Sequence, residues 1–210
     1  MRLSTTSTKM TTRICSGLAL LLTAGAALSA VAEAVPAKTV IEQTVAQVLG
    51  VLQDGERSSA QKRLALEEIA HGRFDFRTMS QLVLGRNWKR LEPTERDEFV
   101  DQFTTYLAND YGSRLDRYEQ EKVAVVGEES KPRGDVVVKT RIVGGANDGV
   151  VVDYRMRPQK DEEWKIIDVV IEGISLVANF RDQFKEVIAR GGPQALIEKL
   201  QEKNAEAAEA

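Results

Sequence analysis

The sequence holds little of the chemistry that most enzyme and metal sites require. Its 210 residues include one cysteine, Cys15, and one histidine, His71. A single histidine excludes a histidine-based metal cluster. The chain also lacks a phosphate-binding glycine loop, a nucleophile elbow and a zinc-protease helix motif. The sequence therefore predicts no catalytic residue set, no metal ion and no cofactor, and His71 is expected at a surface or a helix end.

Two further absences concern partners and location. The formal net charge is -3, which argues against a nucleic-acid partner. The apolar run over 14–28 is too short for a comfortable membrane span. It follows Arg2, Lys9 and Arg13 and precedes small residues suited to cleavage, so residues 1–34 are typical of a secretory signal. Without them the chain has a net charge of -5 and no cysteine, which fits a bacterial periplasm. The alternative is an uncleaved membrane anchor.

Apolar residues recur at helical spacing through the first half of the remaining chain. They predict helices over 35–50, 61–70 and 75–84, with Asp75 as an N-cap, and a longer helix that begins at Pro93. The long helix carries an aromatic stripe that includes Phe99, Phe103, Leu107 and Tyr111. An ordinary core and a ligand pocket would both explain such a stripe.

From residue 121 the apolar period changes to two, which is typical of strands. Four strands are expected, over 123–125, 136–142, 150–156 and 164–171, joined by short turns into an antiparallel meander. An apolar face would pack on helices and a charged face would meet water. The charged face is expected to expose Lys139, Arg141, Asp153, Arg155 and Arg157. This positive patch suggests docking to acidic partners or headgroups, although a solvated sheet face explains it equally.

Gly173 separates the last strand from a helix that begins at Ile174. The glycine supplies either a turn with positive φ or a close backbone approach. Gly191 and Gly192 end this helix, and Pro193 opens another. The last residues, 204–210, are expected to form a frayed tail.

Together these elements predict one α+β domain over 35–203. Its helices would pack on one face of a twisted antiparallel sheet of about four strands. The same plan occurs in the nuclear-transport-factor-like cone, whose interior often holds a ligand. Helices carrying large apolar side chains would cover the curved sheet, so the sequence predicts an apolar cavity between the two layers.

Two blocks of this sequence resemble one family. The first is W-x-I-x-D-V-x-I-E-G-I-S-L-V-x-N-x-R-x-Q-F at 164–184. The second, at 74–103, is F-D-F-x-x-M-x-x-L-V-L-G-x-x-W followed by L-x-P-x-E-R-x-x-F-x-x-x-F. Both are similar to the MlaC / toluene-tolerance family, periplasmic phospholipid-binding proteins that serve an ABC-type lipid transport system.

The resemblance implies a periplasmic, monomeric carrier that encloses phospholipid acyl chains. It implies transient contacts with an inner-membrane transporter complex and an outer-membrane lipoprotein complex, and a role in outer-membrane lipid asymmetry. Burying one CH₂ contributes about 0.8 kcal/mol, so two chains represent on the order of 20 kcal/mol and require a large enclosing cavity. The expected lipid-binding residues are Met79, Leu82, Val83, Trp88, Phe99, Phe103, Tyr106, Val138, Val152, Tyr154, Trp164, Ile166 and Ile174.

Three alternatives stay open at this point. The ligand could be a hopanoid or another polycyclic lipid, with which some relatives of the family look associated. The chain could be a cavity enzyme that uses Asp168 and Tyr154 as an acid/base pair, or an envelope assembly protein. Asp168 is expected instead to accept a hydrogen bond from a backbone N–H or an arginine. Ser175 and its helix N-terminus could meet a phosphate, although capping alone explains them.

Overall fold

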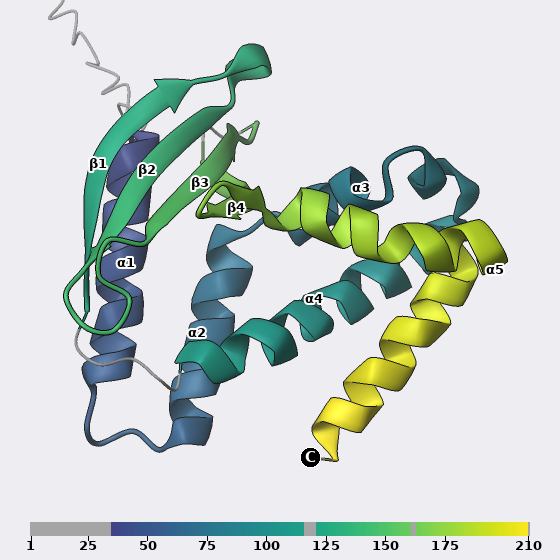
Figure 1. Ribbon diagram of the computed structural model, residues 1–210, viewed down its shortest axis with the longest axis horizontal. Coiled ribbons are helices and arrows are strands. Elements are labelled where there is room, and N and C mark those ends of the chain that lie inside the picture. Colours follow the sequence, from purple (N-terminus) through teal and green to yellow (C-terminus); the bar gives the residue numbers. More distant parts are fainter. Residues whose placement is uncertain (1–34, 116–120, 161–162, 210) are drawn as a thin grey trace, which may run out of the picture. The chain divides into compact units, whose positions relative to one another are not determined.

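The computed structural model describes residues 35–115, 121–160 and 163–209, in which helices pack with one antiparallel sheet (Figure 1). The signal segment predicted over 1–34 lies outside the described residues. Within those three ranges, no helix is both long and apolar enough to cross a membrane.

Helices precede and follow the sheet, as the change of apolar period predicts. They are α1 (Ala37–Gln53), α2 (Ser59–Arg73), α3 (Phe76–Leu84), the 3-10 helix η1 (Gly85–Arg90), α4 (Pro93–Leu115) and α5 (Leu176–Ala208). The predicted start signals are present. The Asp75 carboxylate accepts a hydrogen bond from the Thr78 backbone N–H at 2.8 Å, and Pro93 is the first residue of α4.

The sheet is an antiparallel meander with one strand more than the sequence predicts. Its strands are β1 (Lys122–Ser130), β2 (Val136–Val143), β3 (Val151–Pro158), β4 (Trp164–Ile171) and β5 (Ile174–Ser175), in that spatial order, with a short 3-10 turn η2 (Pro132–Gly134) between β1 and β2. The extra strand has two residues. Alternation cannot be recognised over so short a stretch, which is why the sequence analysis begins the last helix at Ile174 instead.

A tight turn at Glu172 and Gly173 joins β4 to β5. Both residues have positive φ, 49° and 80°, as a two-residue hairpin turn of the I′ kind requires. A Cβ built on Gly173 would meet no other atom within 4 Å. Of the two roles considered for Gly173, the structure therefore supports the turn and not the close backbone approach.

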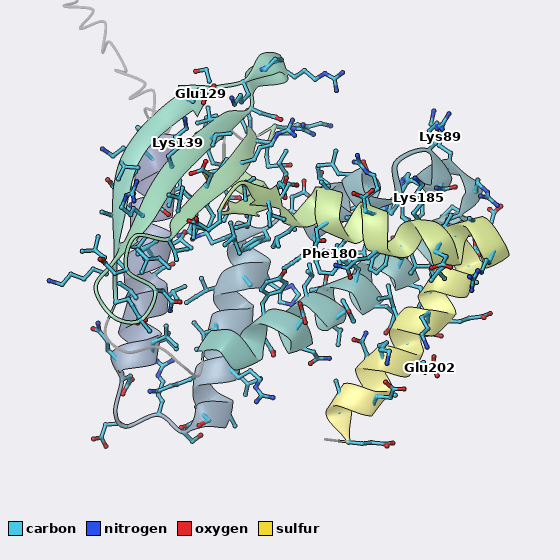
Figure 2. All side chains as sticks on the ribbon, in the orientation of Figure 1. Lys89, Glu129, Lys139, Phe180, Lys185 and Glu202 are labelled. Atoms are coloured by element: carbon cyan, nitrogen blue, oxygen red, sulfur yellow. The ribbon has the colours of Figure 1, made fainter. Side chains whose placement is uncertain are left out.

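The apolar side chains form two clusters rather than one. In the first, here called the sheet cluster, Ala37, Val40 and Ile41 of α1 pack on the inner face of the sheet. The second, the helical cluster, joins α3, α4 and α5 around stacked and edge-on aromatic rings. Phe180 of α5 lies against α4 in this cluster, 5.3 Å from Phe103 between ring centroids (Figure 2). Phe74 contacts both clusters.

This arrangement corrects one expectation. The helices that carry Met79, Phe99 and Phe103 bury these residues against one another and α5, and not against the sheet, although α3 also contacts β4. Only α1 contributes fully buried helical residues to the sheet cluster, among the residues that the structure describes. The periodicity of α3 and α4 identifies an apolar stripe but not the surface that buries it.

The C-terminal helix also differs from its prediction in part. Gly192 has φ 79° and interrupts α5 just before Pro193, so the two predicted helices are present as the two arms of a bent one (Figure 1). The second arm continues through Ala208. Asn204 is buried there and donates a hydrogen bond to the Gln102 carbonyl at 2.9 Å. Residues 204–208 therefore belong to α5, and the fraying expected of the tail stays a prediction.

The charged face of the sheet is neutralised more fully than its sequence suggests. Asp135, whose side chain is 0% exposed, accepts hydrogen bonds from the Arg155 and Arg157 guanidinium groups at 2.9 and 2.7 Å between Nε and carboxylate oxygens. Lys139 forms an ion pair with Glu129 at 3.0 Å (Figure 2). The positive patch expected on this face is therefore partly neutralised, because Asp135, just after η2, is a buried acid that the strand pattern does not show. Arg141 is exposed and donates to the Gly149 carbonyl at 3.0 Å.

Candidate functional site

The structure divides the predicted site residues between the two clusters. Met79, Val83, Phe99 and Phe103 are buried in the helical cluster, with Leu82, Trp88 and Tyr106 at its margin. Val138 and Ile166 are buried in the sheet cluster, with Val152, Tyr154 and Trp164 at its margin. Ile174 belongs to neither and is 62% exposed, because it lies at the turn into β5. The predicted set is thus not one continuous lining.

Helix α2 contributes no residue to either apolar cluster. It has 15 residues and none is buried, although it contains Leu64, Leu66 and Ile69. The helix is held at its two ends. Near its start, Lys62 Nζ donates to the Leu52 carbonyl at 2.8 Å, and at its end Lys165 Nζ donates to the Gly72 carbonyl at 2.7 Å. A helix fixed at both ends whose apolar residues are only partly buried or exposed is suited to bordering a ligand site.

A groove of about 590 Å³ runs between α1 and α2. Its lining consists of Gln47, Gly50 and Val51 from α1, Arg57, then Ala65, Glu68, Ile69, Gly72 and Arg73 from α2, and Glu163 beside β4. At Glu163 the groove borders the sheet cluster, since the next residue, Trp164, packs against that cluster. None of these lining residues is among the lipid-binding residues expected from the sequence. The available signal was a pair of glycines inside helical segments, Gly50 and Gly72.

These two glycines help to make the groove. A Cβ on either residue would meet no other atom within 4 Å, and neither has a positive φ. Their backbones therefore do not need glycine, and glycine in a helix costs about 0.5–1 kcal/mol relative to alanine. Missing side chains on facing helices leave space between the helices. We infer that this space, and not the backbone conformation, is what the two glycines provide.

The volume of the groove falls in the middle of the usual range for ligand sites, roughly 300–1,000 Å³. The sequence analysis expects a larger and enclosed cavity. Additional apolar surface is present on partly buried side chains of the sheet cluster such as Val152, Tyr154 and Trp164, and Trp164 directly follows Glu163 of the groove. The groove and this apolar face together form the candidate site.

Tyr154 shows how dry the sheet side of this site is. Burial raises the pKa of Tyr154 to about 12. The ordinary tyrosine pKa is about 10, so the unfolded chain loses this proton first as the pH rises. Its contribution to stability is therefore complete below pH about 10 and is lost as the pH approaches 12.

Replacement of Tyr154 with phenylalanine is expected to flatten the alkaline limb of the stability profile. Denaturant unfolding of both proteins from pH 8 to 12 measures this effect. Above pH about 10 the free energy of unfolding of the parent should fall more steeply than that of the variant. A constant difference over the whole range would contradict the burial of the phenol.

Asp168 has the structural role that was expected of it. Its carboxylate accepts hydrogen bonds from the Ser175 hydroxyl at 2.6 Å and from the Val177 backbone N–H at 3.1 Å. Ser175 in turn accepts from the Ala178 backbone N–H at 3.0 Å. The Asp168 carboxylate of β4 already occupies the N-terminus of α5. These contacts therefore favour capping over a phosphate site there.

The register of β3 and β4 disfavours the enzyme alternative. Tyr154 lies opposite Val169, and Arg155 lies opposite Asp168. Successive side chains on a strand point to opposite faces of the sheet. Tyr154 therefore points toward the sheet cluster and Asp168 away from it, so the two cannot form an acid/base pair in one cavity.

Known proteins resemble this chain over most of the described part. Residues 42–202 match the family model described as MlaC protein. The chain is 24% identical over 125 residues to the intermembrane phospholipid transport system binding protein MlaC of Haemophilus influenzae, covering 57% of this chain and 58% of that protein. It is 27% identical over 106 residues to the toluene tolerance protein ttg2D of Pseudomonas putida, covering 50% of this chain and 48% of that protein. The chain spans about half the length of the curated relatives it matches.

A solved structure matches the fold over a longer stretch. It is the phospholipid-binding protein from Ralstonia solanacearum, in complex with a phospholipid. The match has a TM-score of 0.75 and 27% sequence identity, and covers 83% of this chain and 99% of that chain. The α+β fold predicted from the sequence is therefore confirmed, with the corrections given above.

Proposed function

Because this chain belongs to the MlaC family, we propose that it is a periplasmic phospholipid carrier. The acyl chains of the bound lipid would lie between α1, α2 and the apolar face of the sheet, and the lipid headgroup would lie at the rim of the groove. The observation that carries this proposal is α2, a helix of 15 residues without one buried side chain beside a groove formed in part by Gly50 and Gly72. The relative from Ralstonia solanacearum, whose structure contains a phospholipid, supports the class of ligand.

The groove by itself is too open to enclose two acyl chains. Complete removal of the chains from water would need the partly buried residues of the sheet cluster as well. We propose that α2 moves outward on loading, pivoting on its tethered ends. Such a movement exposes no buried side chain of α2 itself, since it has none. Its cost in apolar burial is therefore small compared with that of opening the helical cluster.

The same proposal includes the partners and the location of the protein. The carrier would start after a cleaved signal segment, residues 1–34, and act as a monomer without a cofactor. It would exchange lipid with an inner-membrane ABC-type transporter complex and an outer-membrane lipoprotein complex, and so maintain outer-membrane lipid asymmetry. The names of the Haemophilus and Pseudomonas relatives support the transport role and the link to toluene tolerance.

Mass spectrometry of lipid extracted from the full-length chain, expressed with its signal segment and purified from the periplasmic fraction, tests this function. About one phospholipid per protein chain is the expected result. A polycyclic lipid in its place would support the alternative ligand class. A protein that is folded but carries no lipid, and that acquires none from phospholipid vesicles, would overturn the proposal.

A further inference from the structure

The rim of the groove between α1 and α2 carries charges of both signs. Arg57 and Arg73 contribute cations, and Glu68 and Glu163 contribute anions. Two of these groups are already engaged in ion pairs. Arg57 pairs with Asp54 at 3.0 Å, and Glu163 pairs with Lys165 at 2.9 Å.

Arg73 and Glu68 are the rim charges that remain available to a ligand. The Arg73 guanidinium donates to the neutral Gln47 side chain, at 3.4 Å. Glu68 is exposed and has no hydrogen bond or ion pair with any residue in the described ranges. One cation and one anion at the same groove are therefore not neutralised by protein partners.

The helix geometry keeps these two charges apart. The two residues are five positions apart, which corresponds to about 7.5 Å along the helix axis and about 140° around it. Ala65, Ile69 and Gly72 lie between them on the face that lines the groove. The two charges therefore flank the apolar lining instead of neutralising each other across one helical turn.

We propose that this rim selects lipids with a zwitterionic headgroup, an inference that rests on the proposed function. Arg73 would meet the phosphate, because guanidinium donors match phosphate oxygens. Glu68 would meet the ammonium group of phosphatidylethanolamine. An anionic headgroup such as phosphatidylglycerol carries no positive charge for Glu68 and would be repelled by it. The two-carbon link between phosphate and ammonium would cross the lining between the two residues, and the acyl chains would continue from the phosphate into the rest of the groove.

Competitive loading of the mature chain, from which the predicted signal segment 1–34 has been removed, tests the selectivity for the headgroup. The protein is first freed of lipid and then incubated with vesicles of phosphatidylethanolamine and phosphatidylglycerol in equal amounts. Bound lipid is extracted and both the total and the ratio are measured by mass spectrometry. The parent protein is expected to hold roughly three- to fivefold more phosphatidylethanolamine, the size of effect that one exposed charge pair gives.

Variants with matched controls identify the residues responsible. Glu68→Gln is expected to bring the ratio close to one, and Arg73→Gln to lower the binding of both lipids. Glu67→Gln and Arg63→Gln change equivalent charges on α2 outside the groove lining and should leave ratio and total as in the parent. Bound lipid in equal proportions in the parent, or an unchanged ratio in Glu68→Gln, overturns the inference and leaves the carrier function intact. Absence of bound lipid in the parent overturns both.

Discussion

Replacement of Gly72 with leucine is expected to reduce the phospholipid that co-purifies with the protein by at least about fivefold. The new side chain would extend from α2 into the groove, where a Cβ meets no atom within 4 Å. The backbone at Gly72 is helical, and leucine is favoured over glycine in a helix by about 0.5–1 kcal/mol. The variant should therefore be folded and at least as stable as the parent, which separates a blocked site from an unfolded protein.

Two further variants sharpen this experiment. Gly50→Leu approaches the same groove from α1 and should give the same loss of lipid. Gly112→Leu serves as the matched control, since Gly112 is a helical glycine of α4 that also has space around it but does not line the groove. The measurements are lipid per protein chain by mass spectrometry and thermal unfolding. Normal lipid content in both folded groove variants would exclude the groove from the lipid site.

The second large effect is expected for Asp135→Ala, which should lower the free energy of unfolding by about 2–4 kcal/mol. Asp135 is 0% exposed and holds both Arg155 and Arg157. Removal of one partner from a fully buried ion pair leaves the remaining charge buried and unpaired, which costs roughly 3–5 kcal/mol. The two arginines here are about one-third exposed, so water would recover part of that loss. Denaturant unfolding measures the effect.

Glu129→Ala is the control for this substitution. Glu129 also contacts two cations, Lys131 and Lys139, but on the exposed surface of the sheet. Exposed ion pairs contribute little because water solvates the separated charges almost as well. The midpoint of denaturation should therefore stay close to that of the parent. A loss equal to that of Asp135→Ala would contradict the assignment of the stabilisation to the buried acid.

The same cluster gives an expected acid dependence. Burial raises the pKa of Asp135, but the hydrogen bonds and charges of Arg157 and Arg155 outweigh it, so the pKa lies below its ordinary value. The stabilisation is complete above the pKa of the unfolded chain, about 3.9. It is lost as the pH falls from there through the lower pKa of the folded protein. In Asp135→Ala, this part of the acid limb should be absent.

The sequence by itself determined the identity and order of most elements. A period of 3.6 or 2 is a local property, so the spacing alone predicts helices over 35–50 and 61–70, a helix from Pro93, and strands over 136–142 and 164–171. The structure has these elements, with bounds that differ by up to three residues where both ends were predicted. Caps and turns are local as well, which is why Asp75 was predicted correctly as an N-cap and a turn with positive φ was one of the two roles expected for Gly173. The sequence blocks at 74–103 and 164–184 were sufficient to identify the family.

Only the tertiary structure decided which apolar surfaces meet. Phe103 and Trp164 look alike as large apolar residues, yet one lies in the helical cluster and the other at the margin of the sheet cluster. The pairing of Asp135 with two arginines depends on residues 20 and 22 positions apart, which no local pattern encodes. Likewise, α2 contacts α1 and β4 but contributes no fully buried side chain, and the spacing of its own residues cannot show that. Local periodicity fixes what a segment becomes, whereas burial depends on partners that the chain brings together only when it folds.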